Sequence, residues 1–238
     1  MKFGKTTIDQ ISEIWITLHE RAHIELGHFS ILEGVPTFYL VSKSGRSQVQ
    51  EPDLPPELWD KVERCLELQA DHEALEEMLG TMQTADWAEL HVITSSIAAV
   101  MVAIEKIDAQ NQNPSETHPK AATRIFQLLG HVSDMWSIGA CLNGAALPDE
   151  RRIRAFSKEV ILPAYFDAIE QARANDATSF LDDLGDPSVF FADISNAKLG
   201  HWDQLQTRGA QEWAELKEAN EQILPLVYKY QVKNRTSI

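Results

Sequence analysis

The stretch His19-Glu20-Arg21-Ala22-His23 places two histidines four residues apart, with a glutamate directly after the first. An α-helix has 3.6 residues per turn, so side chains four apart lie above one another on one face. Two imidazoles in that arrangement can bind one metal ion, and the glutamate can reach a water on that metal. A random chain of this composition would contain only about 0.02 such HExxH matches. The stretch therefore predicts a helix that binds a metal ion.

A catalytic zinc site needs a third protein ligand and leaves a fourth position open to water. A third histidine ten residues after the first is excluded, because Phe29 occupies that position and His28 is off by one. The stretch ELQAD at 67–71 offers Glu67 and Asp71 instead, four residues apart on one helical face. Alanines beside them would let this second helix approach the HExxH helix closely. We therefore expect the third ligand to be a glutamate from a second helix.

Three short blocks in this order resemble the gluzincin metallopeptidases. HERAHIELGH at 19–28 looks like the compact cytosolic ImmA/IrrE-like and Lit-like (phage-exclusion) peptidases. ELQAD at 67–71 is similar to the ExxAD of the third-ligand helix that these share with membrane-bound HtpX-type enzymes. THPKAATRI at 117–125 looks like the THPxxxxRI signature found downstream in several of these families. The blocks cover about a tenth of the chain, but three in sequence are much more specific than one.

The resemblance implies a zinc-dependent endopeptidase that hydrolyses a peptide bond in a specific intracellular protein. His19, His23 and Glu67 would bind Zn2+, which activates a water and polarises the scissile carbonyl. Glu20 would take the proton from that water and pass it to the leaving amine.

Residues around these ligands would position them or bind developing charge. Asp71 is expected to accept a hydrogen bond from the N–H of a ligand histidine, which fixes the ring. Arg124 or His118 would stabilise the oxyanion of the tetrahedral intermediate, or orient the ligand glutamate. His118 also fits the start of a helix, and His28 could cap the carbonyl end of the HExxH helix. Four histidines have no partner pattern, and we expect them at the surface or in the core: His72, His91, His131 and His201.

Two other functions are compatible with the same residues. One is a non-enzymatic regulatory or interaction protein on a zincin-like helical scaffold, whose acidic C-terminal helices bind a partner. Glu20 argues against this function, because a structural zinc ion needs no general base. The other is a structural metal site closed by a fourth ligand, either His28 or His118.

The composition is that of an ordinary soluble globular protein, with 44% hydrophobic and 24% charged residues over 238 positions. The 36 acidic and 21 basic residues give a net charge of −15. Such a surface repels phosphate backbones, so we expect no nucleic-acid partner. The expected partner is a protein or peptide substrate, and a regulatory protein could be a second one.

Cysteine usage and hydropathy indicate a cytoplasmic location. Two cysteines make no disulfide framework and are typical of a reducing compartment. The N-terminus does not resemble a signal peptide. The most apolar run, 97–104, is far shorter than the roughly 18 residues that a membrane helix needs, so we expect a buried core helix and no membrane partner.

Helical patterning dominates the chain. We expect helices from just after Thr7 to about Gly27-His28, from Pro55-Pro56 to Gly80, from Trp87 to about Ala109, from near Thr117 towards Asn143-Gly144, from Pro148 to about Ala174, across about 188–197 and from about 205 to 232. The convincing strand material predicts a β-hairpin at 37–50, and 182–187 is interpreted as a cluster of turns. The predicted fold is mainly α: a zincin-like metallopeptidase core with a small β-hairpin in residues 1–145, and additional C-terminal helices in 146–238 packed on it.

The position of the hairpin departs from the resembling families, in which a small β-sheet precedes the HExxH helix and aligns the substrate. Only 18 residues precede His19, too few for that sheet. Either the hairpin at 37–50 is its reduced counterpart, or the chain lacks an N-terminal portion. In the first case the hairpin is the candidate edge for a substrate strand.

Overall fold

The computed structural model describes residues 8–33, 54–80, 86–110, 118–144, 146 and 148–236. Over these ranges every regular element is a helix, which confirms the prediction of a mainly α fold. In chain order the elements are α1 (Ile8–Glu25), α2 (His28–Glu33), η1 (Pro56–Leu58), α3 (Val62–Gly80), α4 (Trp87–Gln110), α5 (Ala121–Asn143), α6 (Glu150–Phe156), η2 (Ser157–Ile161), α7 (Leu162–Ala174), α8 (Thr178–Leu184), α9 (Pro187–Lys198), η3 (Trp202–Gln204) and α10 (Arg208–Thr236). The β-hairpin predicted at 37–50 lies outside the described residues.

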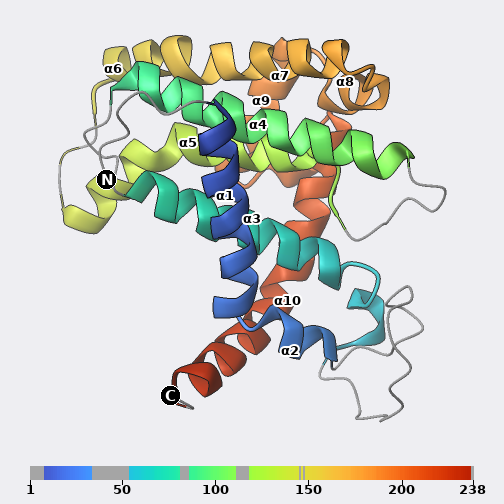
Figure 1. Ribbon diagram of the computed structural model, residues 1–238. Coiled ribbons are helices and arrows are strands. Elements are labelled where there is room, and N and C mark those ends of the chain that lie inside the picture. Colours follow the sequence, from blue (N-terminus) through green and yellow to red (C-terminus); the bar gives the residue numbers. More distant parts are fainter. Residues whose placement is uncertain are drawn as a thin grey trace.

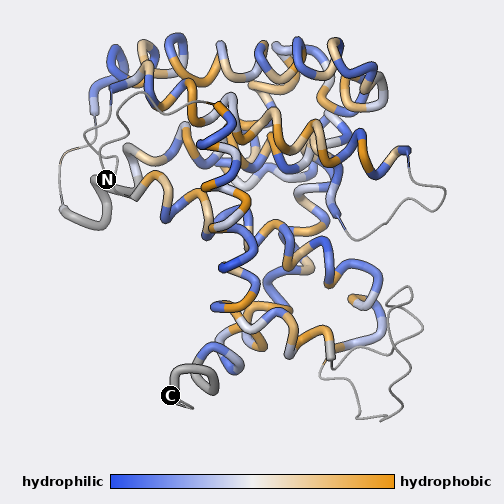
Figure 2. The backbone as a smooth tube through the Cα atoms, viewed as in Figure 1, coloured by the Kyte–Doolittle hydropathy of each residue, from blue (hydrophilic) through white to orange (hydrophobic). Residues whose placement is uncertain are grey.

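The helices form a bundle around α4, which packs against α1, α5 and α7 (Figure 1). α1 lies across α3, and the long α10 runs beside α5 and α3 and reaches α2 (Figure 1). Hydrophobic positions line the inner faces of these helices (Figure 2) and form two clusters of buried side chains. The smaller cluster joins α1, α2 and α3 to α10, so residues from both ends of the chain surround the HExxH segment.

α4 is the most apolar long helix and was expected to be a core helix. By length and composition alone it could cross a membrane, with a mean hydropathy of 1.6 over 18 residues, 44% of them buried. This is weak evidence, because the core helix of a soluble protein passes the same test. Three helices pack against α4, and its buried residues belong to the larger apolar cluster.

Most predicted helix boundaries agree with the structure within a few residues, and three segments differ. The helix expected from Pro55-Pro56 to Gly80 is divided into the 3-10 turn η1 and α3, which begins at Val62. The single helix expected from Pro148 to about Ala174 contains a π-helical turn, η2, which ends at Ile161, two residues before Pro163; this proline has no N–H to donate to the helix. The interpretation of 182–187 as turns was wrong in part, because α8 ends at Leu184. Gly185 follows with a positive φ of 76°, which ends the helix.

The proposed division into a core of residues 1–145 and an extension of residues 146–238 stays a prediction. The larger apolar cluster contains residues from both segments, from Ile11 on α1 to Ala214 on α10. The two segments therefore share buried surface.

Candidate metal centre

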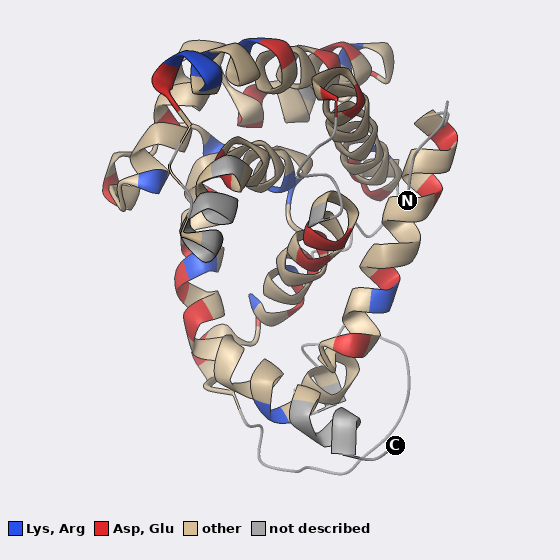
Figure 3. Ribbon diagram, turned by 90° about the vertical axis from the view of Figure 1, so that its left-hand side faces the viewer, with Lys and Arg blue, Asp and Glu red and all other residues tan. Residues whose placement is uncertain are grey.

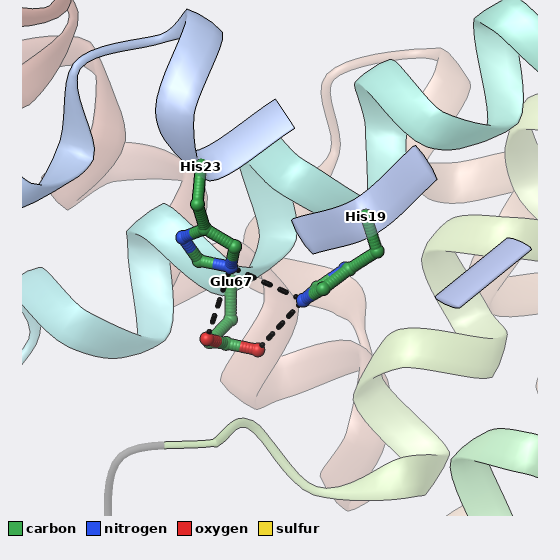
Figure 4. A group of neighbouring side chains, drawn as sticks. All are labelled: His19, His23 and Glu67. Atoms are coloured by element: carbon green, nitrogen blue, oxygen red, sulfur yellow. Dashed lines mark hydrogen bonds and ion pairs between the residues drawn. The ribbon is translucent and has the colours of Figure 1, made fainter. Parts of the chain in front are cut away.

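α1 and α3 bring His19, His23 and Glu67 together (Figure 4). The two histidines lie one helical turn apart on the face of α1 that packs against α3. Ala70 and Ala74 of α3 are fully buried, and their small side chains allow the two helices to approach closely. The three side chains are 8%, 12% and 15% exposed, respectively, so the group is largely shielded from water.

The distances within this group fit a tetrahedral metal ion. His19 Nε2 lies 3.3 Å from Glu67 Oε2, His23 Nε2 lies 3.3 Å from Glu67 Oε1, and the two Nε2 atoms are 3.1 Å apart. Ligands about 2.05 Å from a tetrahedral zinc ion are separated by about 3.3 Å. The three groups could therefore hold Zn2+ with little rearrangement, and we refer to them below as the metal centre.

One oxygen of the Glu67 carboxylate, Oε2, is buried and accepts no well-aligned hydrogen bond from the residues that the structure describes. It lies 3.3 Å from His19 Nε2. Burial raises the pKa of Glu67, but the contacts with His19 and His23 outweigh this and hold the pKa well below its ordinary value. A buried, ionised carboxylate oxygen without a hydrogen bond costs free energy unless a cation binds it. A metal ion at this position would satisfy it.

Asp71 lies on the Nδ1 side of His19, away from the metal centre, and is held there by Arg124. His19 Nδ1 and Asp71 Oδ1 are 2.9 Å apart, which is hydrogen-bond distance, although the ring N–H is not aligned with the oxygen. The buried Arg124 donates to both oxygens of Asp71, with each nitrogen 2.7 Å from its acceptor. Burial raises the pKa of Asp71, and the guanidinium reverses this, so the pKa lies below its usual value. His19 therefore presents Nε2 to the metal centre and Nδ1 to an ionised carboxylate.

The negative charge around the metal centre raises the pKa of His19. Burial lowers this pKa, but the hydrogen-bonding contacts and charges of Asp71 and Glu67 outweigh burial and raise the pKa to about 9. In the absence of a metal ion, a proton on His19 therefore balances the two carboxylates near neutral pH.

His28 supports His23 in a similar way. His28 Nδ1 lies 2.9 Å from His23 Nδ1, and His28 Nε2 lies 3.0 Å from Gln69 Oε1. Burial and the neighbouring His23 lower the pKa of His28 to about 3, so the ring is neutral at pH 7. A neutral His28 that donates from Nε2 to Gln69 must accept at Nδ1, which assigns the proton of His23 to its Nδ1. His23 Nε2 is then unprotonated and able to bind a metal ion.

These contacts give His28 a role that the sequence analysis did not name, since its ring nitrogens meet the side chains of His23 and Gln69. The ring contacts the Nδ1 side of His23, whereas the metal centre lies on the Nε2 side. His28 therefore orients a ligand and is not placed to be a fourth one. The sequence offered no helical spacing for this role, since Gln69 is 41 residues away.

His118 lies at the edge of the metal centre. Its Nε2 is 3.6 Å from Glu67 Oε2, and its Nδ1 is 3.3 Å from Asp108 Oδ2. Its side chain is 34% exposed, more than any of the three ligands. The ring is not part of the group of three converging side chains, so it is not placed as one of their ligands.

Two residues expected to act on the substrate occupy different environments. Glu20 is exposed to solvent directly after His19 and lies outside the group of converging ligand atoms. Arg124 is 2% exposed and bound to Asp71 through two hydrogen bonds. The guanidinium is thus placed to orient Asp71, and the structure does not bring it to the metal centre.

A cavity of about 550 Å3 lies on another side of α3, between α3, α5, α9 and α10. None of the three ligands lines it, but Gln69, the hydrogen-bond partner of His28, does. The cavity is therefore separate from the metal centre and connected to it through one polar side chain. Comparisons of the chain with protein-family models, curated proteins and solved structures found no match.

Proposed function

We propose that the chain is a zinc-dependent endopeptidase of gluzincin type, located in the cytoplasm and acting on a protein or peptide. The observation that supports this most is the convergence of two imidazoles and one carboxylate, from helices 44 residues apart in sequence, at tetrahedral spacing. The zincin-like arrangement of the core and the substrate edge at 37–50 belong to the same proposal.

A bound zinc ion would polarise the scissile carbonyl and make a water nucleophilic near neutral pH. Three ligands leave one position for that chemistry. Glu20, exposed beside His19, takes the proton of the attacking water and passes it to the leaving amine. His118, next to Glu67, donates a hydrogen bond to the oxyanion of the substrate, and Asp108 holds its ring.

The remaining polar residues hold the ligands in place. Asp71 fixes His19 and is itself fixed by Arg124, while His28 fixes His23. Such support behind ligand histidines is typical of catalytic zinc sites, because it sets the tautomer and orientation of each ring. Buried apolar residues around α1 keep water from the ligand side chains.

The test uses a library of peptides from a digested proteome, with cleavage products identified by mass spectrometry. Glu20→Gln is expected to retain the zinc of the metal centre and to cleave about 10²–10⁴-fold more slowly, because the general base is lost. His23→Ala is expected to bind one zinc ion fewer and to cleave nothing.

Glu13→Gln is the matched control, since Glu13 is exposed on the same helix and the chemical change is identical. It should leave zinc content and cleavage unchanged. If the wild-type chain cleaves no peptide, or if Glu20→Gln cleaves as fast as wild type, the peptidase proposal fails. The rival role of a non-enzymatic regulatory protein on the same scaffold would then account for the residues better.

A further inference from the structure

A second group of histidine and glutamate side chains lies farther along α3, away from the metal centre. His72 and Glu76 are four residues apart on α3, and His131 reaches them from α5. One ligand atom from each residue lies within 4.8 Å of the other two. We refer to these three residues as the second cluster.

The contacts of the second cluster bring the exposed His72 and the half-exposed Glu76 against His131. His131 Nε2 is 2.8 Å from Glu76 Oε1. The rings of His72 and His131 meet edge to face at 90°, with centroids 4.8 Å apart. His131 is anchored between the helices with 10% of its side chain exposed, whereas Glu76 is 44% exposed and can adjust. Two imidazoles and one carboxylate are therefore already gathered, and only small rotations are needed to point them at one ion.

The second cluster lies next to the residues that support His19. His72 directly follows Asp71, and both line a small void together with Arg124 and His131. His72 and His131 also line the cavity of about 550 Å3. Nearby Asp134 pairs with Lys198 at 2.7 Å and is not one of the converging ligands. Three protein ligands would leave the rest of the coordination to water.

We infer that His72, Glu76 and His131 form a second binding site, for a divalent transition-metal ion such as Zn2+, that links α3 to α5. Two imidazoles and one carboxylate favour zinc, nickel, cobalt or copper over calcium and magnesium, which prefer oxygen ligands. The ion joins the two helices whose Asp71–Arg124 pair supports the metal centre. Its binding requires no peptidase activity.

The test is zinc stoichiometry in a His23→Ala background, measured by elemental analysis after dialysis of the full chain. This background removes a ligand of the metal centre, so the second site is measured alone. A negative result for the second site therefore leaves the peptidase proposal intact. The His23→Ala chain is expected to retain about one Zn2+, and the added substitution His131→Ala is expected to remove it.

Glu76→Gln serves as a second variant, because its exposed side chain can change without loss of folding. It should weaken Zn2+ binding at least about tenfold, since the ion loses its only charged ligand. His91→Ala is the control: His91 pairs with Asp167 at 2.8 Å and belongs to no group of three ligands among the residues that the structure describes, so its replacement should leave zinc content unchanged.

Thermal unfolding provides an independent measurement. Zn2+ at about one hundred times its Kd should raise the Tm of the His23→Ala chain by about 5–10 °C. This rise should disappear in the variants of His131 and shift to higher zinc concentration in Glu76→Gln. The inference is overturned if the His23→Ala chain binds no zinc, if it keeps its zinc when His131 is replaced, or if its zinc affinity is unchanged in Glu76→Gln.

Discussion

The metal centre and the second cluster contain the same kinds of side chain on one shared helix, but they are held differently. In the metal centre every side chain is at most 15% exposed, and each histidine has a partner on its Nδ1 side. In the second cluster, Glu76 is 44% exposed and reaches the histidines from the surface. Preorganised ligands lose less conformational entropy on binding. We therefore predict that the metal centre binds a metal ion tightly and loses affinity readily on substitution. The second cluster should bind more weakly and should be less sensitive to substitution.

The surrounding charge favours cation binding at both places. Acidic positions outnumber basic ones over the helices seen in Figure 3, in agreement with the net charge of −15. A negative surface attracts divalent cations before they reach either group of ligands. The different support of the ligands, more than the overall charge, should therefore set their relative affinities.

The largest effect is expected from Arg124→Ala, which removes the support of the metal centre. The buried Asp71 would lose both of its hydrogen bonds to the guanidinium, and His19 would face an uncompensated carboxylate. Breaking a buried ion pair in this way destabilises a protein by about 3–5 kcal/mol. We expect Tm to fall by about 10 °C, measured by calorimetry on metal-free protein.

Arg154→Ala is the matched control, because Arg154 pairs with Glu150 at 2.8 Å on the surface, with both side chains at least 80% exposed. Its loss should cost less than about 1 kcal/mol. Equal effects of the two substitutions would mean that the buried Asp71–Arg124 pair stabilises the fold no more than a surface pair does.

The same pair gives the protein a pH dependence. The pKa of Asp71 is lower in the folded state than its ordinary value of 3.8, so the unfolded state binds this proton more tightly. The stabilisation is therefore present above pH 3.8 and is lost as the pH falls through the folded pKa. We expect Asp71→Asn to be less stable than wild type at pH 7, and the difference in free energy of unfolding to shrink below about pH 4. Denaturant unfolding at several pH values measures this, and a constant difference would contradict it.

His28→Gln should produce an intermediate effect confined to the metal centre. Glutamine can still meet His23 but cannot reproduce the geometry of a neutral ring that accepts at Nδ1 and donates at Nε2 to Gln69. Loss of a partner that orients a ligand histidine typically costs 10–100-fold in metal affinity. Zinc competition with a chelator should show this loss at the metal centre and an unchanged affinity at the second cluster. Equal losses at both would show that His28 acts on overall folding.

The grouping of His19, His23 and Glu67 was predictable from the sequence, because the spacing within each helix follows the helical period. Residues 19 and 23, and residues 67 and 71, lie on single helical faces wherever those helices form. The pairing of the two helices was suggested by the alanines beside Glu67 and Asp71. The contacts between side chains of different helices were not predictable. Arg124 binds Asp71 only because α5 packs against α3, and the two residues are 53 positions apart in sequence.

The second cluster shows what a sequence alone leaves hidden. His72 and Glu76 have the spacing of a helical pair, but their neighbour His131 lies 55 residues after Glu76, on another helix. The sequence shows no partner pattern for His72, His91 or His131, and we expected them at the surface or in the core. The structure leaves His72 exposed and pairs His131 with Glu76 and His91 with Asp167. A contact between two helices has no local period, and only the fold brings such residues together.

The smallest effect separates ligand binding from stability in the second cluster. Without zinc, Glu76→Gln removes a pair between His131 and a half-exposed carboxylate, which solvent already screens. Such pairs contribute about 0–1 kcal/mol, so Tm should fall by at most about 4 °C. The same substitution should lower zinc affinity much more than it lowers stability, because the charge of Glu76 contributes more to metal binding than to folding. A fall in Tm of about 10 °C without zinc would be as large as that expected for Arg124→Ala. It would show that the second cluster is a structural ion pair, and that it is not the more adaptable of the two sites.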